Sequence, residues 1–187
     1  MERLSQVLSG LALTAVLGAT PAMAQGAEFS LGGGLTLPLS DFGDVSNTGW
    51  HGLAAVSFAP SSFPLGIQID GMYQRLGVED FGGIDSDIST QIIQGTANVI
   101  YKFKTSEDSQ FRPYLIGGPG VYNFKATGGD AGDGESSTDF GINAGAGFDV
   151  KLGSVGAFIE GRFHNVFTEG SDLNFIPITL GVRLGGN

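Results

Sequence analysis

Apolar and polar side chains alternate residue by residue through eight separate segments of this chain, and this pattern restricts its fold more than any other feature. A period of two is typical of β-strands whose faces meet different surroundings, whereas an amphipathic helix repeats every 3.6 residues. The clearest segment, residues 139–152, alternates Phe140, Ile142, Ala144 and Ala146 with polar residues or glycine. The other segments cover residues 28–37, 50–58, 67–74, 93–103, 113–122, 155–164 and 176–184.

Eight strands of about ten residues suit a closed antiparallel sheet. A tilted strand of ~9–11 residues crosses a bilayer, and an even number of strands closes without leaving an unpaired edge. The sequence therefore predicts an all-β fold, an eight-stranded antiparallel up-and-down transmembrane β-barrel. A β-sandwich or a soluble lipocalin-like barrel has similar strand spacing and is the alternative fold.

Glycine and charge on the polar face indicate that this face points into the barrel. Glycine is frequent, 32 of 187 residues, and gathers on the polar face at positions such as Gly32, Gly34 and Gly145, where small residues fit a narrow interior. Charges on the same face could pair across the lumen, whereas each would cost ~2–4 kcal/mol against lipid. The residues predicted to form an interior ionic network are Asp70, Lys102, Asp149, Glu160, Arg162 and Arg183.

Two further features favour a membrane barrel over the soluble alternatives. The connections predicted at residues 38–49, 76–88, 125–138 and 168–173 are longer than those between them, which is typical of outer-membrane barrels. Aromatic residues of the apolar face are expected at two levels, as interfacial girdles. The girdle residues are Trp50, Tyr73, Phe140 and Phe163 at the long-loop end, and Phe29, Phe58, Tyr101 and Phe103 at the short-turn end.

The first 24 residues are predicted to be a signal peptide and not part of the fold. Arg3 precedes an apolar run from Leu11 to Leu17, and Ala22-Met23-Ala24 forms a small-residue cleavage site. The apolar run is shorter than the ~20 residues that a membrane-spanning helix needs. The sequence thus predicts export, with a cleaved signal over residues 1–24 and one barrel domain over residues 25–187.

The charge balance and the lack of cysteine exclude several classes of function. Nineteen acidic and nine basic residues give a net charge of -10, which argues against a nucleic-acid surface because that needs a clustered basic face. A chain without cysteine has no disulfide scaffold and no thiolate metal site, and we predict no metal or other cofactor. The acidic residues gather in the predicted long loops, where they either hold a divalent cation or keep the loops solvated.

The two histidines, His51 and His164, are the one candidate catalytic feature. Both are predicted near the long-loop rim, and Glu169 and Ser171 lie in an adjoining loop. A histidine beside a serine and an acid could transfer acyl groups, but no nucleophile motif surrounds the serines. We therefore predict no catalytic residues and expect that the chain is not an enzyme.

The later segments resemble the small outer-membrane β-barrel family with its OmpA-like and OmpX-like members. The resemblance is carried by PYLIGGPGVY (113–122), FGINAGAGFDVKL (140–152), FIEGRFHNVF (158–167) and FIPITLGVRL (175–184). It implies an eight-stranded barrel with periplasmic termini and a polar interior without a continuous pore, in which Glu160, Arg162 and Arg183 form an ionic network. It also implies an outer-membrane location, contact with lipid and lipopolysaccharide, and insertion by the barrel-assembly machinery.

Taken together, these features predict a monomeric outer-membrane barrel with a structural or surface-interaction role and no wide pore. A narrow channel and a lipid-modifying outer-membrane enzyme are the alternative functions.

Overall fold

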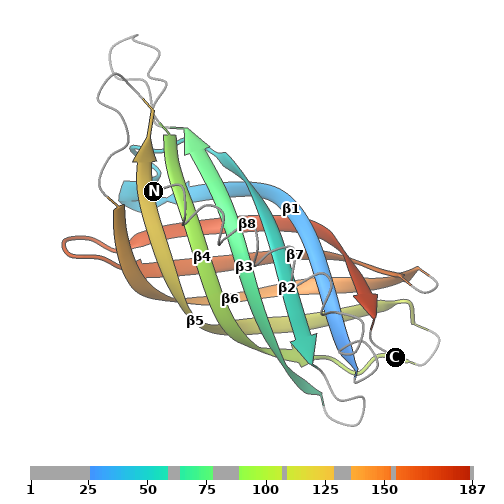
Figure 1. Ribbon diagram of the computed structural model, residues 1–187. Coiled ribbons are helices and arrows are strands. Elements are labelled where there is room, and N and C mark those ends of the chain that lie inside the picture. Colours follow the sequence, from blue (N-terminus) through green and yellow to red (C-terminus); the bar gives the residue numbers. More distant parts are fainter. Residues whose placement is uncertain are drawn as a thin grey trace, which may run out of the picture.

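The chain folds into one closed β-barrel (Figure 1). The computed structural model describes residues 26–58, 64–77, 89–106, 109–128, 136–152 and 155–185, so the predicted signal peptide lies outside the described residues. A short 3-10 helix, η1 (Ser40–Phe42), follows the first strand. The strands are β1 (Ala27–Leu39), β2 (Gly49–Phe58), β3 (Leu65–Gly77), β4 (Ser89–Lys102), β5 (Phe111–Thr127), β6 (Ser136–Leu152), β7 (Val155–Phe167) and β8 (Leu173–Gly185).

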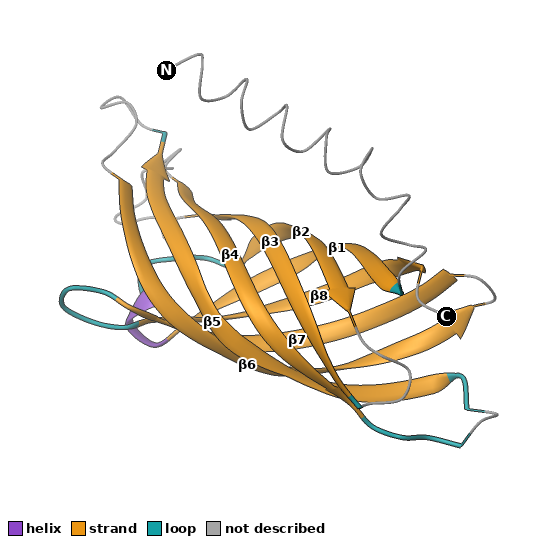
Figure 2. Ribbon diagram, turned by 60° about the horizontal axis from the view of Figure 1, so that its bottom comes forward, coloured by secondary structure: helices purple, strands orange, loops and turns teal. Residues whose placement is uncertain are grey.

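Every strand pairs in antiparallel fashion with its neighbours in the sequence, and β1 closes the sheet by pairing with β8. The closing ladder runs from Glu28↔Gly185 to Leu39↔Asn174. Figure 2 shows the strands tilted around the barrel, with η1 in purple at one end. Closure leaves no sheet edge, which matters where no water can satisfy backbone groups. The predicted fold class is confirmed.

None of the helices among the described residues has the length and apolar character needed to cross a membrane.

Alternate residues of each strand point outward and inward, as the sequence pattern predicts. On β1, Leu31 and Leu35 are each 57% exposed, whereas Ser30 and Thr36 are buried. On β4 the outward Ile93 and Val99 are exposed. The apolar face is therefore the outer wall, and the mixed polar face lines the lumen.

The connections differ from the prediction at one end of the barrel. We call the end where β1 begins and β8 finishes the terminal end, and the opposite end the distal end. β5 and β6 extend further than predicted, so the distal connection between them is confined to residues 128–135. It is no longer than the terminal connection at residues 103–110, and the distal connection at residues 168–172 is shorter still. The length contrast between the two ends is thus weaker than predicted, because strand replaces part of the expected loop.

Two prolines lie inside strands without ending them. The register between β4 and β5 skips Pro119, and the register between β7 and β8 skips Pro177. Each proline still has a partner on its other side, Ile142 and Thr36 respectively. Since proline lacks an N–H donor, it interrupts the ladder on one side only.

Inward glycines allow the lumen to be filled by larger side chains. A Cβ atom at Gly147 would collide with the ring of Tyr114, and one at Gly181 would collide with Phe158. At Gly145 it would lie 2.8 Å from the Cα atom of Arg162. By contrast, a Cβ atom at the outward Gly161 would meet no atom within 4 Å. The inward glycines are therefore required by packing.

We predict that Gly145→Ala lowers the free energy of unfolding by about 1–3 kcal/mol, because the new methyl group overpacks the lumen. Gly161→Ala, on the adjoining strand, is the control and should leave it unchanged or raise it, since its methyl group has open space. Urea unfolding in liposomes, followed by the fluorescence of the single tryptophan, Trp50, measures both. Equal stabilities of the two variants would contradict this explanation of the glycines.

Candidate functional site

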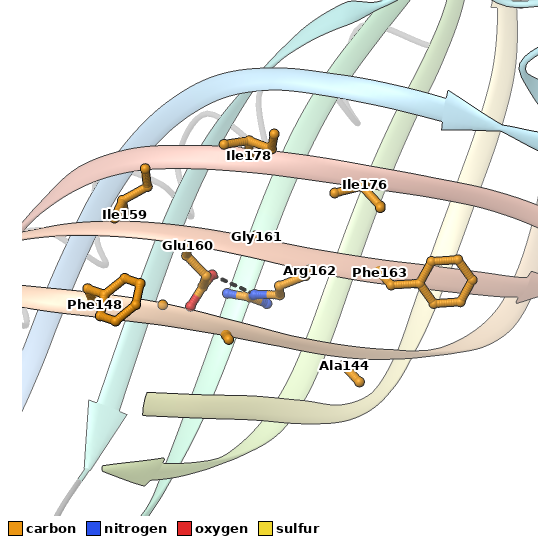
Figure 3. A pocket seen from close by; sticks show the side chains of 11 residues that line it. Ala144, Phe148, Ile159, Glu160, Gly161, Arg162, Phe163, Ile176 and Ile178 are labelled. Carbon is orange, nitrogen blue, oxygen red and sulfur yellow. Dashed lines mark hydrogen bonds and ion pairs between the residues drawn. The ribbon is translucent and has the colours of Figure 1, made fainter. Parts of the chain in front are cut away.

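A buried ion-pair group spans the middle of the lumen. Arg162 on β7 donates from Nη1 to Asp70 Oδ2 on β3 at 2.9 Å and from Nε to Glu160 Oε1 at 2.6 Å. The three side chains are at most 2% exposed. Figure 3 shows Glu160 and Arg162 paired beside each other on β7. Because β3 and β7 lie on different sides of the barrel, the Arg162–Asp70 contact ties two opposing walls together.

Polar neighbours complete the coordination of the two carboxylates in this central group. Asp70 accepts hydrogen bonds from Gln68 Nε2 at 3.0 Å, Thr96 Oγ1 at 2.8 Å and Asn98 Nδ2 at 2.8 Å. Tyr114 donates its hydroxyl to Glu160 Oε2 at 2.8 Å. A buried charge is tolerated when it is both paired and hydrogen-bonded, and this group meets both conditions.

A second ion-pair group lies toward the terminal end. Arg183 on β8 lies 3.0 Å from Glu28 on β1 and 2.9 Å from Asp149 on β6. Lys102 on β4 lies 3.3 Å from the same Glu28 and 3.8 Å from the same Asp149. These contacts connect four strands, including the two strands that close the barrel.

Tyr114 joins the two groups. It accepts a hydrogen bond from Arg183 Nη2 at 2.9 Å while it donates to Glu160. The structure thus places the six predicted network residues in two linked groups and adds Glu28 and Tyr114. Glu28 lies on the polar face of the first predicted strand, so the alternation of that strand could have identified Glu28 as a lumen residue. Tyr114 belongs to the segment 113–122, whose inward face alternation alone does not define.

Both histidines lie in a polar layer on the distal side of the central group. His51 contacts Thr36 Oγ1 through Nδ1 at 3.1 Å and Thr179 Oγ1 through Nε2 at 2.9 Å. His164 contacts the Tyr122 hydroxyl through Nδ1 at 2.8 Å, and its ring is stacked on Phe175. These contacts are typical of structural histidines within a packed lumen.

The structure does not assemble the acyl-transfer group considered from the sequence. Glu169 and Ser171 are exposed in the distal connection, whereas both histidines are buried. Ser171 accepts a hydrogen bond through its main-chain carbonyl from Thr168. Among the hydrogen bonds of the described residues, neither histidine contacts a serine or a carboxylate.

A cluster of buried hydrophobic side chains lies in the lumen toward the distal end. Phe42 of η1 turns back into the barrel and packs edge-on against Phe175, with 6.4 Å between ring centroids. The cluster also contains Leu76, Ile92, Tyr122, Phe124 and Val166. Further apolar residues, Ile100, Tyr114 and Ile116, cluster near the terminal end. The lumen is therefore less uniformly polar than the family resemblance implies, because large apolar side chains fill space between the charged groups.

No group of three or more potential metal ligands among His, Asp and Glu occurs within the described part of the chain. The contacts observed in the described part of the lumen are paired charges, hydrogen bonds and apolar packing.

Most predicted girdle residues project from the outer wall. Trp50, Phe58, Tyr101, Phe103, Phe140 and Phe163 are exposed, whereas Phe29 and Tyr73 are half-buried. Tyr73 packs against Trp50 with 5.6 Å between ring centroids. Sequence reasoning missed a stacked pair, Phe111 and Phe148, whose centroids are 4.6 Å apart near the terminal end.

Comparison with known proteins identifies a family whose sequence model this chain matches. Residues 9–184 match the sequence model of a family described as "Outer membrane protein beta-barrel domain". No curated protein sequence matches the chain.

Solved structures share the fold at low sequence identity. The crystal structure of Neisserial surface protein A superposes with a TM-score of 0.64 and 19% identity, over 85% of this chain and 96% of that one. The attachment invasion locus protein Ail of Yersinia pestis gives a TM-score of 0.52 and 13% identity, over 84% and 97% of the two chains. The N-terminal β-barrel domain of Pseudomonas aeruginosa OprF gives a TM-score of 0.52 and 12% identity, over 85% and 98%. At these identities the likeness concerns the fold.

We predict that Arg162→Met lowers the free energy of unfolding by about 3–5 kcal/mol, because it leaves two buried carboxylates without their cation. Methionine keeps much of the side-chain volume of arginine, so the loss of stability reports mainly the loss of the positive charge. Lys102→Met is the matched control at a partly exposed ion pair and should cost less than about 1 kcal/mol. Urea unfolding in liposomes compares the two, and a loss at Arg162 no larger than that at Lys102 would contradict the central role of Arg162.

Proposed function

Because the chain belongs to the outer membrane protein β-barrel domain family, we propose that it is a non-conducting outer-membrane protein with a structural or surface-interaction role, carried by its distal connections. We further propose that the protein is a monomer and that its distal end faces lipopolysaccharide and the exterior. Its insertion into the membrane is proposed to depend on the barrel-assembly machinery.

The observation that carries this proposal is the packing of the lumen. Arg162 is 1% exposed and lies between Asp70 and Glu160, which blocks the middle of the barrel. Phe42 and its apolar neighbours fill the distal end. An eight-stranded barrel has room for side chains but not for these side chains together with a water-filled pore. The ion pairs are thus proposed to stabilise the barrel and not to conduct ions.

The distal connections are the surface that this proposal offers to a partner. Asp41, Asp44, Glu169 and Asp172 lie in the described distal connections and give them an acidic character. Further acidic residues, Glu79, Asp80, Asp85, Asp87, Asp130, Asp133 and Glu135, fall outside the described residues. Loops held on a rigid barrel are the usual place for recognition, because they vary without disturbing the sheet.

The names of two structural neighbours agree with a role at the cell surface. One is called a surface protein and the other an attachment invasion locus protein. For this chain we propose an interaction through the distal surface, without naming a partner. The outward aromatic residues at the two ends of the barrel are proposed to lie at the two membrane interfaces.

We predict that the purified protein shows no steady openings in planar bilayers, because charged and apolar layers fill its lumen. A general porin reconstituted under the same conditions is the positive control. Steady single-channel openings from the native protein would contradict the proposal and favour the narrow channel.

We also predict that Ser171→Cys is labelled by a membrane-impermeant maleimide on intact cells, since residue 171 is exposed in a distal connection. Lys151→Cys, exposed at the terminal end, is the control and should be labelled only after the outer membrane is permeabilised. The chain has no native cysteine, so each variant carries a single thiol. Labelling of Cys at position 151 but not at 171 on intact cells would reverse the proposed orientation.

A further inference from the structure

The outer wall of the barrel carries charge at two strand positions, and both charges are positive and distal. Among the outward positions of the described strands, only Arg75 on β3 and Lys125 on β5 are charged. Arg75 is exposed and Lys125 is half-buried. The other charged strand residues stand at lumen-facing positions, namely Glu28, Asp70, Lys102, Arg112, Asp139, Asp149, Lys151, Glu160, Arg162 and Arg183.

The two outward cations lie in one row of the sheet. Arg75 is paired with Gln91 on β4, and Gln91 is paired with Lys125 on β5. The three strands run side by side (Figure 1). Neighbouring strands are ~4.8 Å apart, so the Cα atoms of the two cations are separated by ~10 Å. Both side chains are long, and they can therefore reach one anionic group that lies over Gln91.

A hydrogen bond holds the Arg75 side chain over β4, on the side of Lys125. Arg75 Nε donates to Ser89 Oγ on β4 at 3.0 Å, and Ser89 Oγ contacts Thr127 Oγ1 on β5 at 3.0 Å. Among the hydrogen bonds between described residues, Arg75 uses Nε alone. A guanidinium group binds phosphate oxygens through paired N–H donors, so an arginine held in this way suits a phosphate.

Aromatic residues beside the row give its level in a membrane. Trp50 on β2 is the register partner of Arg75 and is exposed on the outer wall. Tyr73 lies two residues nearer the middle of β3 and packs against Trp50. Tryptophan and tyrosine gather at the headgroup level of a bilayer. The row therefore lies at the level of lipid phosphates, and exposed apolar residues such as Ile93 and Val121 continue the wall below it.

We propose that Arg75 and Lys125 bind a phosphate group of lipid A, the membrane anchor of lipopolysaccharide. The inference rests on the proposed orientation, in which the distal end faces lipopolysaccharide, and it names the part of the wall that holds this lipid. Charge complementarity carries it, because the acidic distal connections repel phosphate whereas this row attracts it. The aromatic and apolar neighbours of the row favour a phosphate that belongs to a lipid over a soluble acidic partner.

Native mass spectrometry of the folded protein, released from detergent with added lipid A, tests the proposal. Dephosphorylated lipid A keeps the acyl chains and is the control ligand, and phosphatidylglycerol is the competing phosphate lipid. EDTA is present so that no divalent cation links phosphate to the acidic connections. The test variant is Arg75→Gln with Lys125→Gln. Its matched control, Arg112→Gln with Lys151→Gln, removes the same two kinds of charge at exposed terminal positions, and an unboiled gel first shows that each variant is folded.

We expect the native protein and the control variant to retain lipid A equally, and the test variant to retain about tenfold less, which corresponds to ~1.4 kcal/mol in binding. The native protein should retain dephosphorylated lipid A as weakly as the test variant retains lipid A. Equal retention of lipid A by the two double variants would overturn the proposal, and is the result expected if acidic side chains of the distal connections already neutralise both cations. Preferential retention of phosphatidylglycerol would also overturn it.

Failure of this site can be distinguished from failure of the proposed orientation. Maleimide labelling of Ser171→Cys on intact cells measures the orientation without any lipid ligand. If Cys at position 171 is labelled while the two double variants retain lipid A equally, the lipid A site is wrong and the orientation stands.

Discussion

The hydrocarbon core of a bilayer offers no hydrogen-bond partners, and the rest of this structure depends on that constraint. Every backbone N–H and C=O group that faces lipid must be paired within the sheet. Pairing of β1 with β8 removes the two edges that an open sheet would leave. The same constraint favours polar side chains in the lumen. The alternation of apolar and polar residues in the sequence therefore follows from the contact of the outer face with lipid. Pro119 and Pro177 show its limit, since each interrupts one ladder but keeps its other partner strand.

Once the polar side chains point inward, the narrow lumen must neutralise and pack them. Arg162 binds Asp70 across the barrel, and Arg183 with Lys102 binds Glu28 and Asp149 nearer the terminal end. Apolar layers occupy the space between and beyond these groups. A lumen filled in this way ties opposing strands together. This packing is the basis for proposing the distal connections as the surface that meets other molecules.

Much of this architecture could be predicted from the sequence, because a period of two assigns each side chain to one face. The outward position of Leu31 and the inward position of Arg162 follow directly from their strands. Contacts across the lumen could not be predicted in the same way, since the meeting of Asp70 with Arg162 depends on the tilt and register of all eight strands. The packing of Phe42 inside the barrel could not be predicted either. It depends on the short helix η1 turning inward after β1, which only the folded chain shows.

A spin-label scan of neighbouring residues in β8 of the membrane-embedded protein tests most directly whether the apolar face of the barrel lies in lipid. Single cysteines at positions 178, 179, 180 and 182 suffice, because the native chain has none. If the apolar face lies in lipid, molecular oxygen from the bilayer reaches labels at 178, 180 and 182, whose native side chains are exposed, and reaches the label at the buried position 179 far less. Oxygen accessibility that is uniform along β8, or highest at 179, would contradict a barrel with its apolar face in lipid.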